Sequence, residues 1–183
     1  MTFSLSGPGL WYATRAAGLV TLLLLTMSVL LGVLTAGRFA SDRWPRFLTV
    51  GLHRNLSLLA VVFLAIHVGT TVVDTYTSIP AAAAFVPFIS SYKTAWLGLG
   101  AIALDLFIAL ILTSLARLRL GHRSWRAVHW TAYACWPVAL AHGIGIGTDR
   151  STVWVIGLTL ACVAAVASAA AWRLAAGARA GAR

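Results

Sequence analysis

The chain of 183 residues is 60% hydrophobic and only 10% charged, and its mean hydropathy is +0.89. This composition excludes an ordinary soluble domain and indicates an integral membrane protein. The net charge of +10 does not indicate nucleic-acid binding, because the basic residues cluster at alternate ends of the apolar runs, as in a membrane protein that follows the positive-inside rule.

Five apolar runs are long enough to cross a hydrocarbon core roughly 30 Å thick as helices, which rise about 1.5 Å per residue. In chain order they are 16–36, 56–73, 95–116, 127–147 and 152–171. We interpret the first run as a permanent span, because no basic segment precedes it and it exceeds the apolar region of a typical signal peptide. We therefore expect an all-α integral membrane protein, a bundle of five transmembrane helices.

Basic residues are distributed unequally between the two sides of this bundle. Eleven of the fourteen fall between the first two runs, between the third and fourth, or after the fifth: Arg38, Arg43, Arg46, Arg54, Arg117, Arg119, Arg123, Arg126, Arg173, Arg179 and Arg183. Only Arg15, Lys93 and Arg150 remain for the opposite side. The bias predicts an outside N-terminus and an inside C-terminus for a multi-pass protein of the cytoplasmic membrane.

The remaining features of the chain favour one membrane domain covering residues 1–183. The segment after the fifth run is too short to form a domain, so we expect no flavin or nicotinamide domain. Cys135 and Cys162 lie in apolar runs and lack the patterns of covalent haem attachment or iron–sulfur ligation, which indicates packing residues.

The second and fourth runs contain a faint internal repeat, seen when "HRNLSLLAVVFLAIHVG" is set beside "HWTAYACWPVALAHGIG". Each segment begins and ends its apolar part with a histidine. His53 and His67 are fourteen residues apart, and His129 and His142 are thirteen apart, so each pair spans about 20 Å of helical rise. With one span between them the two helices run in the same direction, which places His53 and His129 at the inner level and His67 and His142 at the outer level.

Histidines at matched depth on two membrane helices indicate a shared ligand, because ionisable residues within spans usually face the bundle interior and have a function. One neutral imidazole from each helix makes a six-coordinate haem site suited to electron transfer. Two stacked haems would form an electron path across the membrane. The alternatives are interhelical hydrogen bonding with a structural role, and a non-redox transporter or assembly factor whose histidines bind metal or protons.

One detail of the spacing requires a distortion of the fourth helix. At about 100° per residue, His67 lies within roughly 40° of His53, but His142 lies about 140° from His129 on an ideal helix. Pro137 lies between the two and removes a main-chain hydrogen bond. We therefore predict a kink at Pro137 that turns His142 toward its partner.

These residues resemble the ferric reductase-like transmembrane domain, a family that includes ferric reductases, NADPH oxidases and the haem subunit of the bacterial periplasmic methionine sulfoxide reductase system. The resemblance covers about residues 10–170. It depends on the histidine spacing in the two repeated segments and on "LTSLARLRLGHRSWRAVHWTAYACWPVALAH", which is similar to the lead into the histidine helix of the methionine sulfoxide reductase subunit.

The resemblance implies two b-type haems with iron ligands paired as His53 with His129 and His67 with His142. It also implies electron flow from a cytoplasmic-side donor to an outer-side acceptor, with the donor a flavoprotein, a quinol or a separately bound flavin. A quinone-linked haem anchor for a partner oxidoreductase is the alternative within the same class. No residue is predicted to be catalytic, and intrinsic enzymatic activity is left open.

Several other residues are candidates near these ligands. Asp105, in the third run, is a candidate to accept a hydrogen bond from a haem-ligating imidazole, with a structural bond to Ser or Thr as the alternative. Arg15, Arg54 and Arg126 are candidate contacts for haem propionates, since guanidinium groups bind carboxylates, with headgroup contact as the alternative. His122 lies in a basic inner loop, where we expect solvent or a propionate around it.

Overall fold

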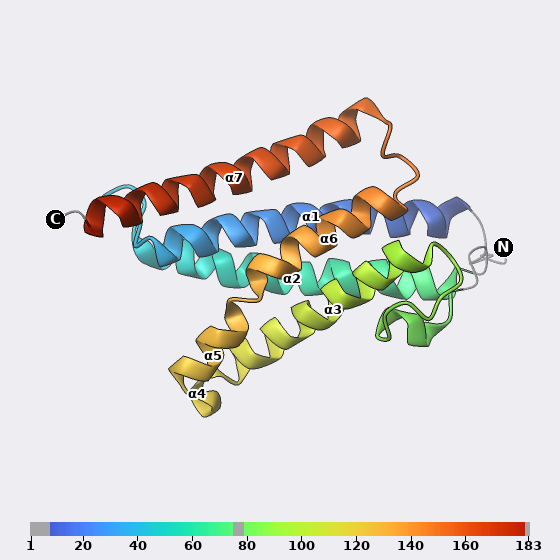
Figure 1. The fold of residues 1–183 in the computed structure, drawn as a ribbon, viewed down its shortest axis with the longest axis horizontal. Coiled ribbons are helices and arrows are strands. Elements are labelled where there is room, and N and C mark those ends of the chain that lie inside the picture. The colour runs from blue at the N-terminus through green and yellow to red at the C-terminus, as the bar shows by residue number, and fades with distance from the viewer. Residues whose placement is uncertain (1–7, 75–78, 182–183) are drawn as a thin grey trace. The chain divides into compact units, whose positions relative to one another are not determined.

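The computed structural model describes residues 8–74 and 79–181, and this part of the chain is helical and contains no strand. The helices are α1 (Pro8–Ala36), α2 (Arg46–Val73), the short 3₁₀ helix η1 (Ala81–Ala84), α3 (Thr94–Leu115), α4 (Arg117–Leu120), α5 (His122–His129), α6 (Ala132–Ile146) and α7 (Val153–Gly181) (Figure 1). The expected all-α fold is confirmed.

Four helices of the described chain, α1, α2, α3 and α7, are long and apolar enough to cross a membrane. They correspond to the first, second, third and fifth expected spans. The region of the fourth expected span, 127–147, is divided between α5 and α6 and contains no single helix of that length. The count of five spans and their orientation therefore stay predictions.

The helices α1, α2 and α7 extend beyond the apolar runs from which they were predicted. α2 begins at Arg46 and not near residue 56, so His53 and Arg54 lie within a helix and not in the loop before it. Hydropathy detects only the lipid-facing length of a helix, whereas its main-chain hydrogen bonds continue into the polar interface. This extension places both histidines of the second run on one continuous helix.

The distortion between His129 and His142 lies before Pro137, so the predicted position of the kink was wrong. α6 continues through Pro137, while α5 ends at His129 and the chain bends before α6 begins at Ala132 (Figure 1). The intervening turn is tightened by hydrogen bonds between residues three apart, including Thr131 N to Val128 O at 2.9 Å. A proline crowds the carbonyl four residues before it, here that of Tyr133, which lies in the first turn of α6 and after the break.

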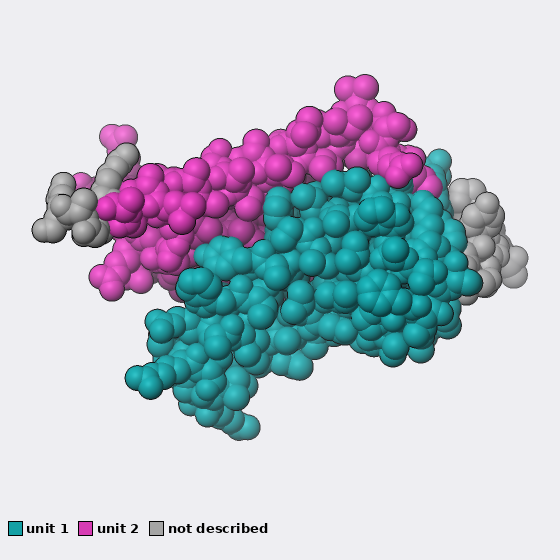
Figure 2. Space-filling view, in the orientation of Figure 1, with its two compact units in different colours: residues 1–22, 63–147 teal, residues 23–62, 148–183 magenta. Residues whose placement is uncertain are grey.

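The chain divides into two compact units (Figure 2). Unit 1 comprises residues 1–22 and 63–147. Within it α3 packs along α6 through small residues, because Gly98, Ala101 and Ala103 are buried on α3 and Gly145 is buried on α6. Small residues let membrane helices approach closely.

Unit 2 comprises residues 23–62 and 148–183. It includes the turn between α1 and α2, where the indole N–H of Trp44 donates to Oγ1 of the fully buried Thr49 at 2.9 Å. The ring of Trp172 on α7 packs against Gly37, where a β-carbon would lie 2.7 Å from it. These contacts close one end of unit 2.

Candidate functional site

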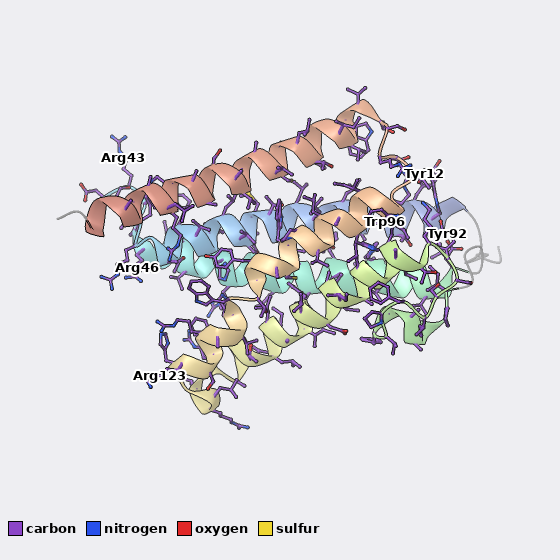
Figure 3. All side chains as sticks on the ribbon, viewed as in Figure 1. Tyr12, Arg43, Arg46, Tyr92, Trp96 and Arg123 are labelled. Carbon is purple, nitrogen blue, oxygen red and sulfur yellow. The ribbon has the colours of Figure 1, made fainter. Side chains whose placement is uncertain are left out.

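Two of the four predicted ligand histidines face each other within unit 1. His67 on α2 and His142 on α6 have ring centroids 6.3 Å apart, and their ring planes are nearly perpendicular at 81°. Figure 3 shows Tyr12, Tyr92 and Trp96 at the same end of unit 1, opposite the end that carries Arg123. The structure therefore brings together the histidine pair predicted for the outer level.

Each imidazole of this pair is oriented by a main-chain carbonyl from a neighbouring helix. The Nδ1 of His67 lies 2.8 Å from the carbonyl oxygen of Thr14, and the Nδ1 of His142 lies 2.8 Å from that of Trp96. A carbonyl oxygen only accepts, so Nδ1–H donates in each ring, and in the neutral imidazole Nε2 then keeps its lone pair. Both rings thus have the tautomer that a metal ligand needs.

A glycine faces each of these rings on the helix that supplies the carbonyl. A β-carbon at Gly18 would lie 3.0 Å from the Nδ1 and Cε1 of His67, and one at Gly100 would lie 2.6 Å from the same atoms of His142. Gly18 is four residues after Thr14, and Gly100 is four residues after Trp96. The carbonyl and the glycine are therefore one helical turn apart. The carbonyl accepts the hydrogen bond of the ring, and the glycine leaves space for the ring beside the helix.

His53 has the same surroundings within unit 2. Its Nδ1 lies 2.9 Å from the carbonyl oxygen of Ser28, and a β-carbon at Gly32, four residues later, would lie 3.6 Å from its Cε1. Ser57, one turn along α2, donates to the carbonyl oxygen of His53 at 2.8 Å. Three of the four predicted ligands therefore share one local arrangement.

His129, the last residue of α5, lies in unit 1 and is contacted by an aromatic side chain. The ring of Trp125 stacks on it with centroids 4.9 Å apart and planes 25° apart. Because His53 belongs to unit 2, the pairing of His53 with His129 stays a prediction from the family resemblance.

The other predicted site residues are placed as follows. Arg15 is next to Thr14 on α1 and stacks on Trp11, with its guanidinium carbon 4.0 Å from the ring centroid. Arg54 and Arg126 are exposed, beside His53 and one turn before His129. The contact of these three arginines with haem propionates stays a prediction.

Asp105 lies on an exposed face of α3, and His122 is exposed on α5 with its ring 5.6 Å from that of Trp125. Main-chain carbonyls accept the ring hydrogen bonds of His53, His67 and His142. For these three rings they therefore take the role that was predicted for Asp105. A role for Asp105 near His129 stays a prediction.

The donor set fits haem better than a bare cation. Two imidazoles that share one metal through bonds of about 2 Å have ring centres roughly 6 Å apart, which agrees with the 6.3 Å between His67 and His142. Among residues 8–74 and 79–181 no group of three or more His, Cys, Asp or Glu side chains could hold a metal ion. Protein-bound zinc normally takes three or four protein ligands, whereas two imidazoles complete a haem iron.

A protein-family model described as the ferric reductase like transmembrane component matches residues 17–145. The chain belongs to this ferric reductase-like family. The resemblance inferred from the histidine segments is thus confirmed, and the matched ferric reductase-like region includes all four histidines. Searches of the curated proteins and of the solved structures gave no match. A ferric reductase-like domain indicates electron transfer in a membrane and generally binds haem.

The glycines and the carbonyl acceptors of the ring hydrogen bonds were missed from the sequence. Gly18 and Gly32 are fourteen residues apart, as are His53 and His67, and this equal spacing was the signal that could have identified them. Trp125 was missed as well, because a tryptophan at the end of an apolar run is usually a membrane-interface residue.

Proposed function

We propose that the protein transfers electrons across the membrane through two b-type haems, each held by two histidines. The observation that carries this proposal is the facing pair His67 and His142, whose Nδ1 atoms both donate to main-chain carbonyls and whose Nε2 lone pairs are left for iron. When bound, haem supplies a one-electron couple in the apolar interior.

The chain's own residues orient and enclose that group. The carbonyls of Thr14 and Trp96 hold each imidazole in one tautomer and one plane, so little reorganisation accompanies a change of charge at the metal. Gly18 and Gly100 let the helices approach the rings without a side chain between them.

The second haem and the direction of transfer extend this proposal. We assign His53 and His129 to an inner haem, because His53 repeats the carbonyl and glycine arrangement of the outer pair. The proposed donor is a flavoprotein, a quinol or a bound flavin at the cytoplasmic side. The acceptor lies on the outer side, and its chemistry is left unassigned.

A difference spectrum of the purified protein, reduced minus oxidised, tests the proposal when it is combined with a haem-to-protein ratio. We expect low-spin b-type bands and a ratio near two. Protein that folds but binds no haem would refute electron transfer and favour a non-redox transporter or assembly factor. A ratio near one haem per protein would show that either the inner or the outer proposed site does not bind haem.

Single histidine variants then assign each haem. His67→Ala and His142→Ala should each abolish the outer haem and keep the inner one, because each removes an axial ligand of the same site. The matched control is His122→Ala, which removes an exposed histidine that we do not assign as a ligand. Equal loss of both haems in the His67 and His142 variants would contradict the pairing.

A further inference from the structure

His129 has an aromatic side chain stacked against its ring. The rings of His53, His67 and His142 each have a main-chain carbonyl at Nδ1, supplied by another helix. The ring of His129 has the face of Trp125, one turn earlier on its own helix, stacked at 4.9 Å and nearly parallel at 25°. An aromatic ring face therefore lies against one of the four proposed ligands.

Trp125 is itself fixed by a second helix. Its indole N–H donates to Oγ of Ser114 on α3 at 3.4 Å, and both residues belong to unit 1. Ser114 is fourteen residues after Gly100, which faces the outer ring of His142. Fourteen residues are close to four helical turns, so Ser114 lies on nearly the same face of α3 as Gly100.

His122 lies one turn before Trp125, with ring centroids 5.6 Å apart and planes 38° apart. Three aromatic rings thus follow one face of α5, with Trp125 between the two histidines. A tryptophan that only anchors the membrane interface directs its N–H toward water or headgroups. Here the N–H is directed to a side chain of α3 and the ring face is directed to a proposed ligand.

We propose that Trp125, anchored by Ser114, is the positioning residue for His129 and sets the plane of the inner axial imidazole. This inference rests on the proposed function, because it assigns His129 to the inner haem. A stacked indole restricts rotation of the imidazole about its side-chain bonds, as the carbonyl bonds do for the other three rings. The groups that orient and surround a metal ligand are among the features by which a protein tunes the potential of a haem.

The predicted consequence is a selective change at the inner haem. Trp125→Ala removes the stacked ring, so the inner haem should be retained roughly 2- to 13-fold more weakly, the range given by the loss of one aromatic pair. Trp125→Phe keeps a ring but not the N–H, and should restore most of the inner haem with a shifted midpoint potential. Ser114→Ala keeps Trp125 and should shift the inner midpoint potential with little loss of haem.

The experiment is a redox titration of each purified full-length variant, with the haem-to-protein ratio and the low-spin EPR spectrum recorded on the same samples. His129→Ala identifies the signal of the inner haem. The matched control is Trp154→Ala, which removes a 58% exposed indole on α7. We expect it to leave both potentials unchanged.

The outer haem reports the folding of each variant. A change in the inner midpoint potential of Ser114→Ala or Trp125→Phe, with the outer haem intact, supports the inference, and unchanged inner potentials in both overturn it even if Trp125→Ala fails to fold. Wild-type protein without haem would refute the proposed function itself. Wild-type protein with two haems and unaltered variants would refute only the role of Trp125.

Discussion

A main-chain carbonyl is a suitable partner for a ligand imidazole inside a membrane. It fixes the tautomer of the ring without placing a negative charge in a medium of low dielectric constant, where a carboxylate such as Asp105 costs about 2.5 to 3.5 kcal/mol on insertion scales. The carbonyl of Trp96 also accepts the hydrogen bond of its own helix, and a second lone pair accepts from His142. His142 thus needs no charged residue to orient it.

The glycine opposite each ring leads to a graded prediction for three substitutions. Gly100→Ala should weaken outer haem binding most, because the new β-carbon would lie 2.6 Å from His142. Gly18→Ala, at 3.0 Å from His67, should have a smaller effect, and Gly32→Ala, at 3.6 Å from His53, should have little. Overpacking of about 1 to 3 kcal/mol corresponds to roughly 5- to 150-fold weaker binding for the first variant.

The order of the three variants is measured by following haem loss during heating, or after dilution into buffer without a chelator. Gly69→Ala on α2 and Gly143→Ala on α6 are the controls, because a β-carbon at either position meets nothing within 4 Å. Alanine is the better helix former, so both controls should retain haem as well as wild type does. Similar losses in Gly143→Ala and Gly100→Ala would show that the space beside the ring is not what matters.

The crossed planes of the outer pair predict a particular EPR spectrum. The rings of His67 and His142 are 81° apart. When the planes of the two axial imidazoles are perpendicular, the dxz and dyz orbitals of a low-spin ferric iron have nearly equal energies. Parallel planes make these two energies different. We expect a strongly anisotropic low-spin signal that disappears in His142→Ala. A rhombic signal of the parallel-ring type from the outer haem would contradict this geometry.

At the scale of the element, the break between α5 and α6 separates the placement of His129 from that of His142. A straight helix would point the two rings about 140° apart. The tightened turn at Trp130 and Thr131 ends α5 at His129, and α6 then carries His142 on an uninterrupted helix. His142 can therefore be oriented by the Trp96 carbonyl on α3, and His129 by Trp125 on its own helix.

Pro137→Ala tests which residue causes this separation. Since α6 continues through Pro137, the alanine can donate to the Tyr133 carbonyl without moving His142. We expect the outer haem to remain and the protein to lose haem at a higher temperature, because an interior proline costs up to about 3 kcal/mol relative to alanine. Selective loss of the outer haem would show instead that the proline orients His142.

The sequence was sufficient for the features that depend on hydropathy and on residue type. The helical fold and the family could be predicted, because long apolar runs seldom occur outside membrane helices. Histidines within such runs are also rare unless they bind a ligand. The orientation of the rings could not, because it depends on carbonyls of Thr14, Ser28 and Trp96, which any residue type supplies. The break at Trp130 and Thr131 was not predicted, because neither residue type interrupts a helix as proline does.

At the scale of the whole molecule, the number of spans depends on whether α5 and α6 together cross the membrane. α6 has 15 residues, about 22 Å of rise, which is less than a hydrocarbon core of roughly 30 Å. The tightened turn and α5 supply the remaining length. If they cross, the chain has five spans and its ends lie on opposite sides; if they do not, the four long helices place both ends on the same side.

The arginines favour five spans, and reporter fusions can test this. With five spans, the tail carrying Arg173, Arg179 and Arg183 lies inside; with four it lies outside, against the positive-inside rule. A fluorescent protein that matures only in the cytoplasm should therefore fluoresce when fused after residue 183. Alkaline phosphatase, which is active only outside, should be active when fused after residue 149. An active phosphatase after residue 183 would establish four spans and would place the end of α6 and the tail on sides opposite to those proposed.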